Sequence, residues 1–186
     1  MPMSESLRSL QSFSAFIYPD NGYNNWFGSS SKSLFEKKSW YDLGYTSIEK
    51  ALTTCERLFQ RDIVLPTRVP PMVFTHQFGR CYHDTDENGA NNEFSAEYVH
   101  EKKNDVRYSI TVRPAKFGMK LIQKRIKHVY TLQNQAKAVL YRIRDDVPLY
   151  ILILEKDGWQ YRLMLDDGGL NQASSDILLG IANTIQ

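Results

Sequence analysis

The stretch from Pro148 to Asp167, PLYILILEKDGWQYRLMLDD, decides the fold. Two apolar runs of strand length flank Asp157-Gly158, and this dipeptide between apolar strands is the strongest short-range signal for a two-residue hairpin turn. Its residues tolerate the positive φ angles that such a turn requires. Because so short a turn can join only antiparallel strands, the stretch predicts an antiparallel hairpin and, with it, an antiparallel sheet.

Two further strands are expected on the N-terminal side, at EFSAEYVHEK (93–102) and NDVRYSITVRP (104–114). In both runs apolar and polar residues alternate, and residues two apart in a strand share a face. The short connection from Lys102 to Asp105 predicts that the two runs form a second hairpin. Their expected apolar faces consist of Phe94, Ala96, Tyr98 and His100 in the first run and of Val106, Tyr108, Ile110 and Val112 in the second.

A helix and a proline-rich segment precede these strands. In TSIEKALTTCERLFQR (46–61), apolar residues recur three and four positions apart, and Thr46 with Glu49 matches a capping box, so a helix is expected. LPTRVPP (65–71) then contains three prolines, which fix φ and remove backbone donors. This segment must therefore be extended, and it leads into an expected first strand at Val73–Tyr82.

The region after residue 114 is less regular. KLIQKRIKHVY (120–130) fits a helical stripe and also the alternation of a strand, and periodicity does not decide between them. VYTLQ (129–133) and AVLYRI (138–143) have the composition of two strands, with a turn at Asn134 and Gln135.

A last helix is expected in SSDILLGIANTIQ (174–186), with Ser174 or Ser175 as its N-cap. Hairpin-linked strands with a helix at each end predict an α+β domain over residues 46–186, in which a curved antiparallel sheet packs against the two helices. Residues 1–45 carry ten aromatic residues, which disordered tails rarely contain, so this segment is expected to pack on the domain.

Composition narrows the function classes. An apolar content of 42% and an aromatic content of 12% are values of a globular domain, and a formal net charge of +2 gives no reason to expect a specific nucleic-acid partner. No apolar run reaches membrane-spanning length, and the N-terminus lacks the charged-then-apolar pattern of a signal peptide. If the chain as written is complete, the cytoplasm is the expected location, and a chain trimmed of an export or anchoring segment is the alternative.

Five motifs in the same order resemble a known family. They are YTSIEKA, LPTRVPP, YSITVRP, YILILEKDGWQYRLMLD and SSDILLGIANTI, and they span residues 45–186. A family of Gram-positive extracytoplasmic proteins shows a similar helix, a P-x-x-x-P segment, a W…Y-x-L strand and an LL-x-I-A-x-S-I helix. These proteins are similar to the lipoprotein-carrier and RseB-type sigma-factor-regulator fold, a half-open antiparallel barrel wrapped around helices. The resemblance implies an extracytoplasmic or membrane-associated location.

The resemblance also implies a non-catalytic binding or sensing domain, because the family brings no established catalytic residues and no cofactor. In relatives of this fold the concave sheet face buries acyl chains or a partner segment, so a hydrophobic small molecule, a lipid or a protein segment is the expected ligand. The residues expected to line its site are Tyr98, Tyr108, Ile110, Tyr150, Leu152, Trp159 and Tyr161. Plain packing of these side chains against a helix is the alternative.

Cysteine and histidine chemistry offers a rival function. Cys81 and His83 share one face of the first expected strand, with His76 nearby, so a cysteine-dependent enzyme using Cys81 and His83 is the alternative. A structural zinc site needs four ligands in a recognisable spacing, and the second pair is missing, so no metal is expected. Cys55 lies on the apolar helix stripe, which favours two buried thiols, and a Cys55–Cys81 disulfide is the alternative in an exported protein. In a third interpretation, the aromatic N-terminal segment serves a cytoplasmic interaction module.

Positive charge is concentrated between Ala115 and Arg144, where eight Lys and Arg residues occur without an Asp or Glu. A solvated sheet face explains this distribution as an ordinary surface. The functional alternative is weak binding to an anionic surface through a compact patch. The residues expected to form that patch are Lys120, Lys124, Arg125 and Lys127.

Overall fold

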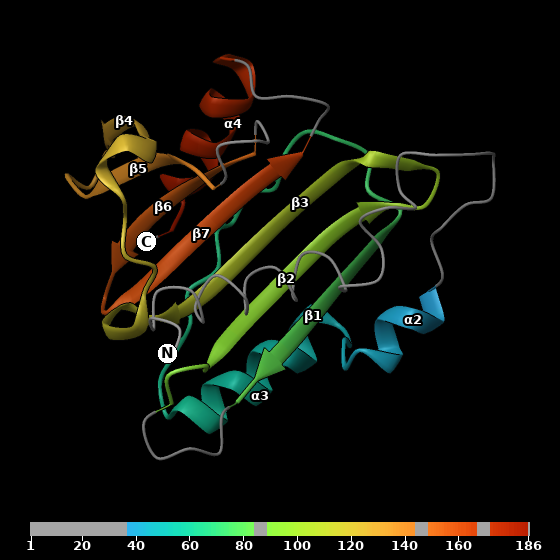
Figure 1. Cartoon of the computed structure of the whole chain (residues 1–186). Helices are drawn as coiled ribbons and strands as arrows, with labels where there is room; N and C mark the ends of the chain where they lie inside the picture. The colour runs from blue at the N-terminus through green and yellow to red at the C-terminus, as the bar shows by residue number, and fades with distance from the viewer. Residues whose placement is uncertain (1–36, 84–88, 144–148, 167–171, 186) are drawn as a thin grey trace, which may run out of the picture. The chain divides into compact units, whose positions relative to one another are not determined.

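The computed structural model describes residues 37–83, 89–143, 149–166 and 172–185 (Figure 1). Residues 35–186 form one compact unit. The expectation that residues 1–45 pack on the domain falls outside the described residues, apart from the short helix α2 (Lys37–Asp42) and the residues that follow it. This last part of the segment does pack on the domain, because Trp40 and Tyr45 lie against the first strand of the sheet.

The described strands form one seven-stranded sheet. They are β1 (His76–Tyr82), β2 (Glu93–His100), β3 (Lys103–Pro114), β4 (Ile126–Thr131), β5 (Lys137–Arg142), β6 (Tyr150–Lys156) and β7 (Trp159–Asp166). Their order across the sheet is β1-β2-β3-β7-β6-β5-β4, and all neighbours are antiparallel. The sheet does not close into a barrel, because β1 and β4 remain at its two edges. The predicted α+β class with an antiparallel sheet is confirmed.

The β6–β7 hairpin forms as the Asp-Gly dipeptide predicts. Asp157 and Gly158 have φ angles of 48° and 69°, so both turn residues lie in the left-handed region that a type I′ turn requires. Lys156 pairs with Trp159 across this turn. Both strands are buried on both faces over most of their length, which explains why their sequence is a nearly continuous apolar run.

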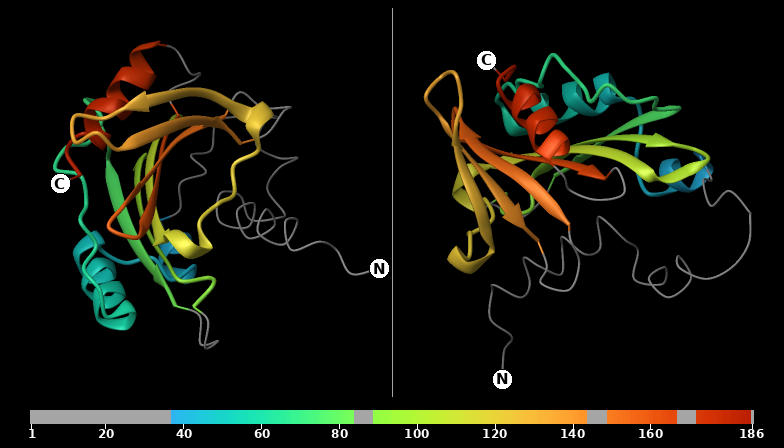
Figure 2. Two further views of the ribbon diagram at one scale, coloured as in Figure 1. Left: turned by 90° about the vertical axis from the view of Figure 1, so that its left-hand side faces the viewer. Right: turned by 90° about the horizontal axis from the view of Figure 1, so that it is seen from above.

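One face of the sheet, termed here the helix-covered face, packs against α3 (Ile48–Phe59) and α4 (Gln172–Ala182) (Figure 2). The apolar faces predicted for β2 and β3 both lie on this side, and the register pairs Phe94 with Val112. Alternate residues of β5, β6 and β7 extend the same apolar surface. The main core therefore lies between the sheet and these two helices.

Helix α3 is capped by Ser47 and not by Thr46. The Ser47 Oγ accepts a hydrogen bond from the Lys50 N–H at 3.2 Å. Thr46 instead forms a β-bridge with Gly79 of β1, with N···O distances of 2.7 and 2.8 Å. Because α3 approaches β1 closely here, a Cβ on Gly79 would lie 2.6 Å from the Ile48 Cα, so the position requires glycine. The predicted capping box is thus shifted by one residue through a tertiary contact.

A disulfide joins Cys55 of α3 to Cys81 of β1, with 5.4 Å between the two Cα atoms. The structure therefore contains the bridge and not the two buried thiols that the apolar stripe favours. Cys55 is fully buried, and Cys81 packs against the same core cluster. The bond fixes α3 to the edge strand on the helix-covered face.

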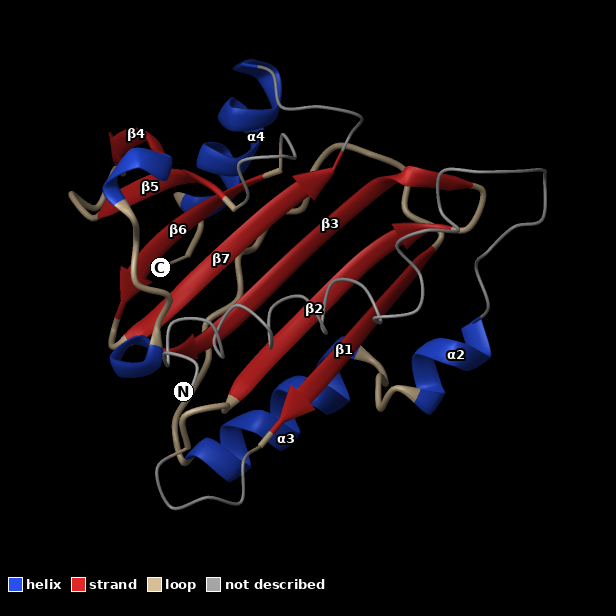
Figure 3. Ribbon diagram, viewed as in Figure 1, coloured by secondary structure: helices blue, strands red, loops and turns tan. Residues whose placement is uncertain are grey.

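The long connection from β3 to β4 contains two short 3₁₀ turns, η1 (Ala115–Phe117) and η2 (Gln123–Arg125) (Figure 3). The interpretation of residues 120–130 as a helix is therefore wrong. From Ile126 onward these residues form a strand, as their alternation indicates. The turn between β4 and β5 includes Gln135 at a φ of 67°, in agreement with its predicted place.

Two elements begin at other residues than the sequence predicts. Helix α4 begins at Gln172, so Ser174 and Ser175 are buried inside the helix and do not cap it. The proline-rich segment is neither helix nor strand, its end turns through a hydrogen bond from the Met72 N–H to the Pro70 carbonyl at 2.7 Å, and the ladder of β1 starts only at His76. One anchor of this segment is the Thr67 N–H, which donates to the Thr184 Oγ1 at 3.1 Å.

Candidate functional site

All seven residues predicted to line a ligand site lie on the helix-covered face. Tyr108, Ile110, Leu152, Trp159 and Tyr161 are buried in the core cluster, and Tyr98 and Tyr150 are half-buried against it. The same cluster contains Ala51 and Cys55 of α3 and Leu178 of α4. These side chains thus pack in the core against the helices, which is the alternative given for them above. A role in lining a ligand site stays a prediction.

Tyr108 is an unusual member of this core. Its hydroxyl is buried and has no hydrogen-bond partner among the described residues. The ring centroids of Tyr98 and Tyr108 are 5.5 Å apart. Burial raises the pKa of Tyr108 far above its ordinary value, so the hydroxyl stays protonated. An unsatisfied buried hydroxyl costs about 1–3 kcal/mol, which marks this position as one where a further polar group would be stabilised.

The residues of the cysteine hypothesis do not form a reactive pair. The Sγ of Cys81 is bonded to Cys55 and carries no thiol in this state. His83 is exposed and stacks on Phe59 with 6.1 Å between ring centroids, and His76 stacks on Phe78 at 6.0 Å. Within the described ranges, no group of three or more His, Cys, Asp or Glu residues could hold a metal ion.

The opposite side of the sheet, termed the polar face, carries the charged residues that the strands bury. Its central part is formed by Glu93, Ser95 and Glu97 of β2, by Arg107, Ser109, Thr111 and Arg113 of β3, and by Gln160, Arg162 and Met164 of β7. Glu97, Gln160 and Arg162 are only 5%, 3% and 3% exposed. Buried charges are costly unless they are paired, so their partners define what this face can do.

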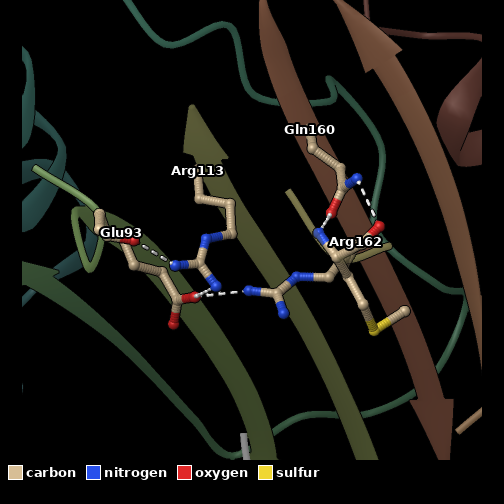
Figure 4. A network of polar contacts seen from close by, with 6 residues as sticks. Glu93, Arg113, Gln160 and Arg162 are labelled. Atoms are coloured by element: carbon tan, nitrogen blue, oxygen red, sulfur yellow. Dashed lines mark hydrogen bonds and ion pairs between the residues drawn. The ribbon is translucent and has the colours of Figure 1, made fainter. Parts of the chain in front are cut away.

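Arg162, Glu93 and Arg113 form the centre of the polar face (Figure 4). The Arg162 Nη2 donates to the Glu93 Oε2 at 2.5 Å, and the Arg113 Nη1 lies 4.0 Å from the same oxygen. The Arg113 Nη2 also donates to the Ala90 carbonyl at 2.7 Å, whereas its buried Nε has no hydrogen-bond partner in the described part of the chain. Two guanidiniums therefore share one carboxylate.

Among Glu93, Arg113 and Arg162, the charge of Arg162 has the largest desolvation cost, because this side chain is the most buried. Burial lowers the pKa of its guanidinium, the Glu93 carboxylate opposes that change, and the neighbouring charge of Arg113 adds to it. A guanidinium nevertheless remains charged at neutral pH because its ordinary pKa is above about 12. Glu93 therefore compensates the charge of Arg162, which this side chain cannot lose by deprotonation.

One end of the polar face is covered by the β3–β4 connection. The Gln160 Oε1 accepts from the Met119 N–H at 2.7 Å, and the Gln160 Nε2 donates to the Met119 carbonyl at 3.3 Å. The same Nε2 donates to the Glu155 Oε1 at 3.3 Å. One buried amide thus fixes the connection against β7.

Trp40 covers the other end of the polar face. Its ring stacks on Phe78 at 4.9 Å between centroids, and the Arg107 Cζ lies 6.0 Å from the ring centre. The Arg107 Nε donates to the Glu97 Oε2 at 2.9 Å, which pairs these two charges. Burial, with a contribution from the Glu97 charge, raises the pKa of Tyr45 to about 12. This end is therefore an aromatic cluster over a complete ion pair.

An apolar strip adjoins the central cluster. Ile153 of β6 is the ladder partner of Arg162, and Ile151 is the partner of Met164. These three apolar side chains are buried and point to the polar face. A cationic centre beside an apolar strip can bind a molecule that joins an acidic group to an apolar body.

The sequence gives little warning of this cluster. Glu93, Arg113 and Arg162 come from three strands, and each occupies a position that alternation assigns to the solvent side. The one local signal is Arg162, a charge inside the otherwise uncharged run WQYRLML. Such a residue is rarely buried without a specific partner.

A shallow depression on the exposed side of α3 is a weaker candidate. It is lined by Ser47, Glu49, Lys50, Thr53, Thr54 and Arg57. These side chains come from about three turns of a single helix and its cap, and most are exposed. They form the solvated face that an amphipathic helix normally presents.

Comparisons of the chain with models of protein families, with curated proteins and with solved structures found no match. In the part of the chain that the structure describes, no helix is long and apolar enough to cross a membrane.

Proposed function

We propose that this chain is a non-catalytic binding or sensing domain that holds a lipid-like acid on the polar face of its sheet. The observation that carries the proposal is the pair of guanidiniums, Arg113 and Arg162, that share the single carboxylate of Glu93. These three side chains together carry a formal charge of +1, two guanidiniums against one carboxylate. In a buried site the attraction of that charge for a ligand carboxylate is stronger than it would be in water.

The geometry of the side chains supports an acidic group as the recognised feature. A guanidinium presents planar, parallel donors that match a carboxylate, and the buried Nε of Arg113 is a donor that the described residues leave unused. The apolar body of the ligand would lie along Ile151 and Ile153 in place of the atoms that now bury these two side chains, which are 1% and 3% exposed.

The same proposal includes the half-open barrel that the sequence resemblance implies. An open antiparallel sheet with two helices against one face supports it. In this arrangement the helices fill the face that the sequence marks as apolar, and the ligand takes the opposite face.

Calorimetric titration of the full chain with decanoate and with 1-decanol tests the proposal, because these ligands share an apolar body and differ in charge. Decanoate should bind at least about 10-fold more tightly, since hydrogen bonds to charged groups contribute about 1.5–3 kcal/mol. Arg113→Gln should weaken decanoate binding by about 10- to 100-fold and leave 1-decanol unchanged. Arg68→Gln, at an exposed position of the proline-rich segment, removes the same charge and should change neither affinity.

Two results would count against this placement. Equal affinities for decanoate and 1-decanol would show that the charged cluster does not recognise the ligand. Weaker decanoate binding in Tyr150→Leu, with Arg113→Gln unaffected, would move the site to the helix-covered face and to the residues expected from the sequence. Native mass spectrometry of the purified protein adds a direct search for a bound acid or a bound peptide.

A further inference from the structure

The connection between β3 and β4, together with the start of β4, carries a row of exposed positive charge. Figure 1 shows this connection running along one side of the sheet from the end of β3 to β4. Four of its lysines have exposed side chains, and they are termed the lysine row: Lys116, Lys120, Lys124 and Lys127. The sequence between Ala115 and Arg144 contains no Asp or Glu.

Arg125 differs from these lysines, although the sequence places it in the same patch. Its Nη1 donates to the Ile143 carbonyl at 2.9 Å, and the side chain is half-buried. The Ile122 N–H donates to the Tyr141 hydroxyl at 3.4 Å, which adds a second anchor. Arg125 therefore holds the connection to the end of β5, while the lysine row points outward on a fixed backbone.

Apolar side chains are exposed beside the lysine row. Ile122 is 43% exposed between Lys120 and Lys124, and Val129 is 49% exposed two residues after Lys127. Exposed apolar residues among lysines have the composition of segments that lie in the interface of a membrane, where the apolar groups enter the headgroup layer and the lysines stay at the phosphates.

We propose that the lysine row and Ile122 bind the surface of an anionic lipid bilayer. The lysines supply attraction to the negatively charged headgroups, and Ile122 enters the interfacial layer. A nucleic acid would use the same charges, but it would gain little from Ile122 and Val129, so the observed combination favours lipid. The inference stands independently of the ligand site on the polar face, because it uses none of the same residues.

The expected effects follow from the charge near the surface. Each basic residue close to an anionic membrane contributes about a fivefold increase in the partition coefficient. Four such residues give a large increase even when only some of them reach the lipid. Because exposed charges are screened over about 10 Å at 0.1 M salt and about 3 Å at 1 M, the binding should fall steeply as salt is added.

Co-sedimentation of the full chain with vesicles tests the proposal. Vesicles of equimolar phosphatidylglycerol and phosphatidylcholine should bind the protein at low salt, and vesicles of phosphatidylcholine alone should not. Exchange of all four residues of the lysine row to Gln should lower the partition coefficient by at least about 50-fold. The matched control exchanges four other exposed lysines, Lys37, Lys38, Lys50 and Lys102, to Gln and should change binding by less than about threefold, although the net charge changes equally.

Ile122→Ser isolates the apolar contribution without a change of charge, and it should lower the partition coefficient by about fivefold. Equal losses in the two quadruple variants would overturn the proposal, because binding would then depend on net charge alone. It would also be overturned if Ile122→Ser bound as well as the original chain while duplex DNA bound more tightly than the vesicles. Thermal unfolding of each variant verifies that the fold is retained.

Discussion

The helix-covered face and the polar face bury their side chains in different ways. The helix-covered face is a continuous apolar surface beneath α3 and α4, and the Cys55–Cys81 disulfide fixes one of these helices to it. The polar face instead buries Arg162 and Glu97, and it holds them through individual contacts to Glu93 and Arg107.

This difference separates the side chains whose burial stabilises the fold from the side chains to which the proposed function assigns ligand binding. Apolar packing stabilises the protein without a requirement for exact orientation. A buried ion pair recovers its desolvation cost only with good geometry, and apolar residues of the same size often serve stability as well or better. Stability alone therefore does not account for Arg162, and the proposed function assigns it to recognition of an acidic ligand.

The largest effect is expected for Leu163→Ala, which opens a cavity in the core of the helix-covered face. It should lower the free energy of unfolding by about 4 kcal/mol. The neighbouring Arg162→Met, on the polar face, should cost less than about 1 kcal/mol, because it removes a buried charge and Glu93 keeps Arg113 as its partner. Urea denaturation measures both, and equal losses would contradict the contrast between the faces.

Reduction of the disulfide should come next. Cys55 and Cys81 are 26 residues apart, and the chain-entropy relation for a loop of this size gives about 3.5 kcal/mol of stabilisation. Unfolding with and without a reductant measures this value. The Cys55→Ala/Cys81→Ala variant serves as the control, since its stability should not respond to the reductant, and an equally insensitive original chain would speak against the bridge.

Glu93→Gln should lower the free energy of unfolding by about 3 kcal/mol, because it removes the carboxylate that accepts from the buried guanidinium of Arg162. Glu93→Gln/Arg162→Met should recover most of this loss, since neither charge remains. A double-mutant cycle in urea gives the coupling directly. Simple addition of the two single effects would show that the ion pair does not link β2 to β7.

The smallest effect compares two tyrosines on opposite faces at alkaline pH. Burial raises the pKa of Tyr45 and of Tyr161 to about 12, above the ordinary value of 10.0. The folded state therefore keeps a proton that the unfolded state loses, so each contribution is fully present below pH 10 and is lost as the pH rises to about 12. Each should amount to about 2 kcal/mol. Tyr45→Phe and Tyr161→Phe should each reduce the fall in stability between about pH 9 and 12, and an unchanged fall would contradict the raised pKa values.

The sequence predicts the pairing of strands well where the chain itself provides the signal. Asp157-Gly158 determines a turn by its own backbone preferences, and the alternation around Phe94 and Val112 identifies residues that share a face. Alternation cannot say which face a ligand uses, because the aromatic side chains that suggest a binding site are the ones that fill a core.

Several features that the sequence misses arise from contacts between distant elements. Ser47 becomes the N-cap because Thr46 is taken by Gly79, and the disulfide forms because that close approach brings α3 to β1. Arg113 and Arg162 become neighbours only because β7 returns to lie beside β3 after β4, β5 and β6 have formed their own ladder. No local pattern carries this information.

The bridge between Cys55 and Cys81 also changes how the molecule would respond to a pulling force. Residues between the two cysteines cannot lengthen while the bond is intact, so the oxidised chain reaches a full extension that is shorter by about 85 Å than the reduced chain. Load arriving from the N-terminal side would pass from α3 directly into the edge strand β1, and it would bypass the proline-rich segment between them. While the bond is intact, that segment carries no load. After reduction, the segment can extend under force.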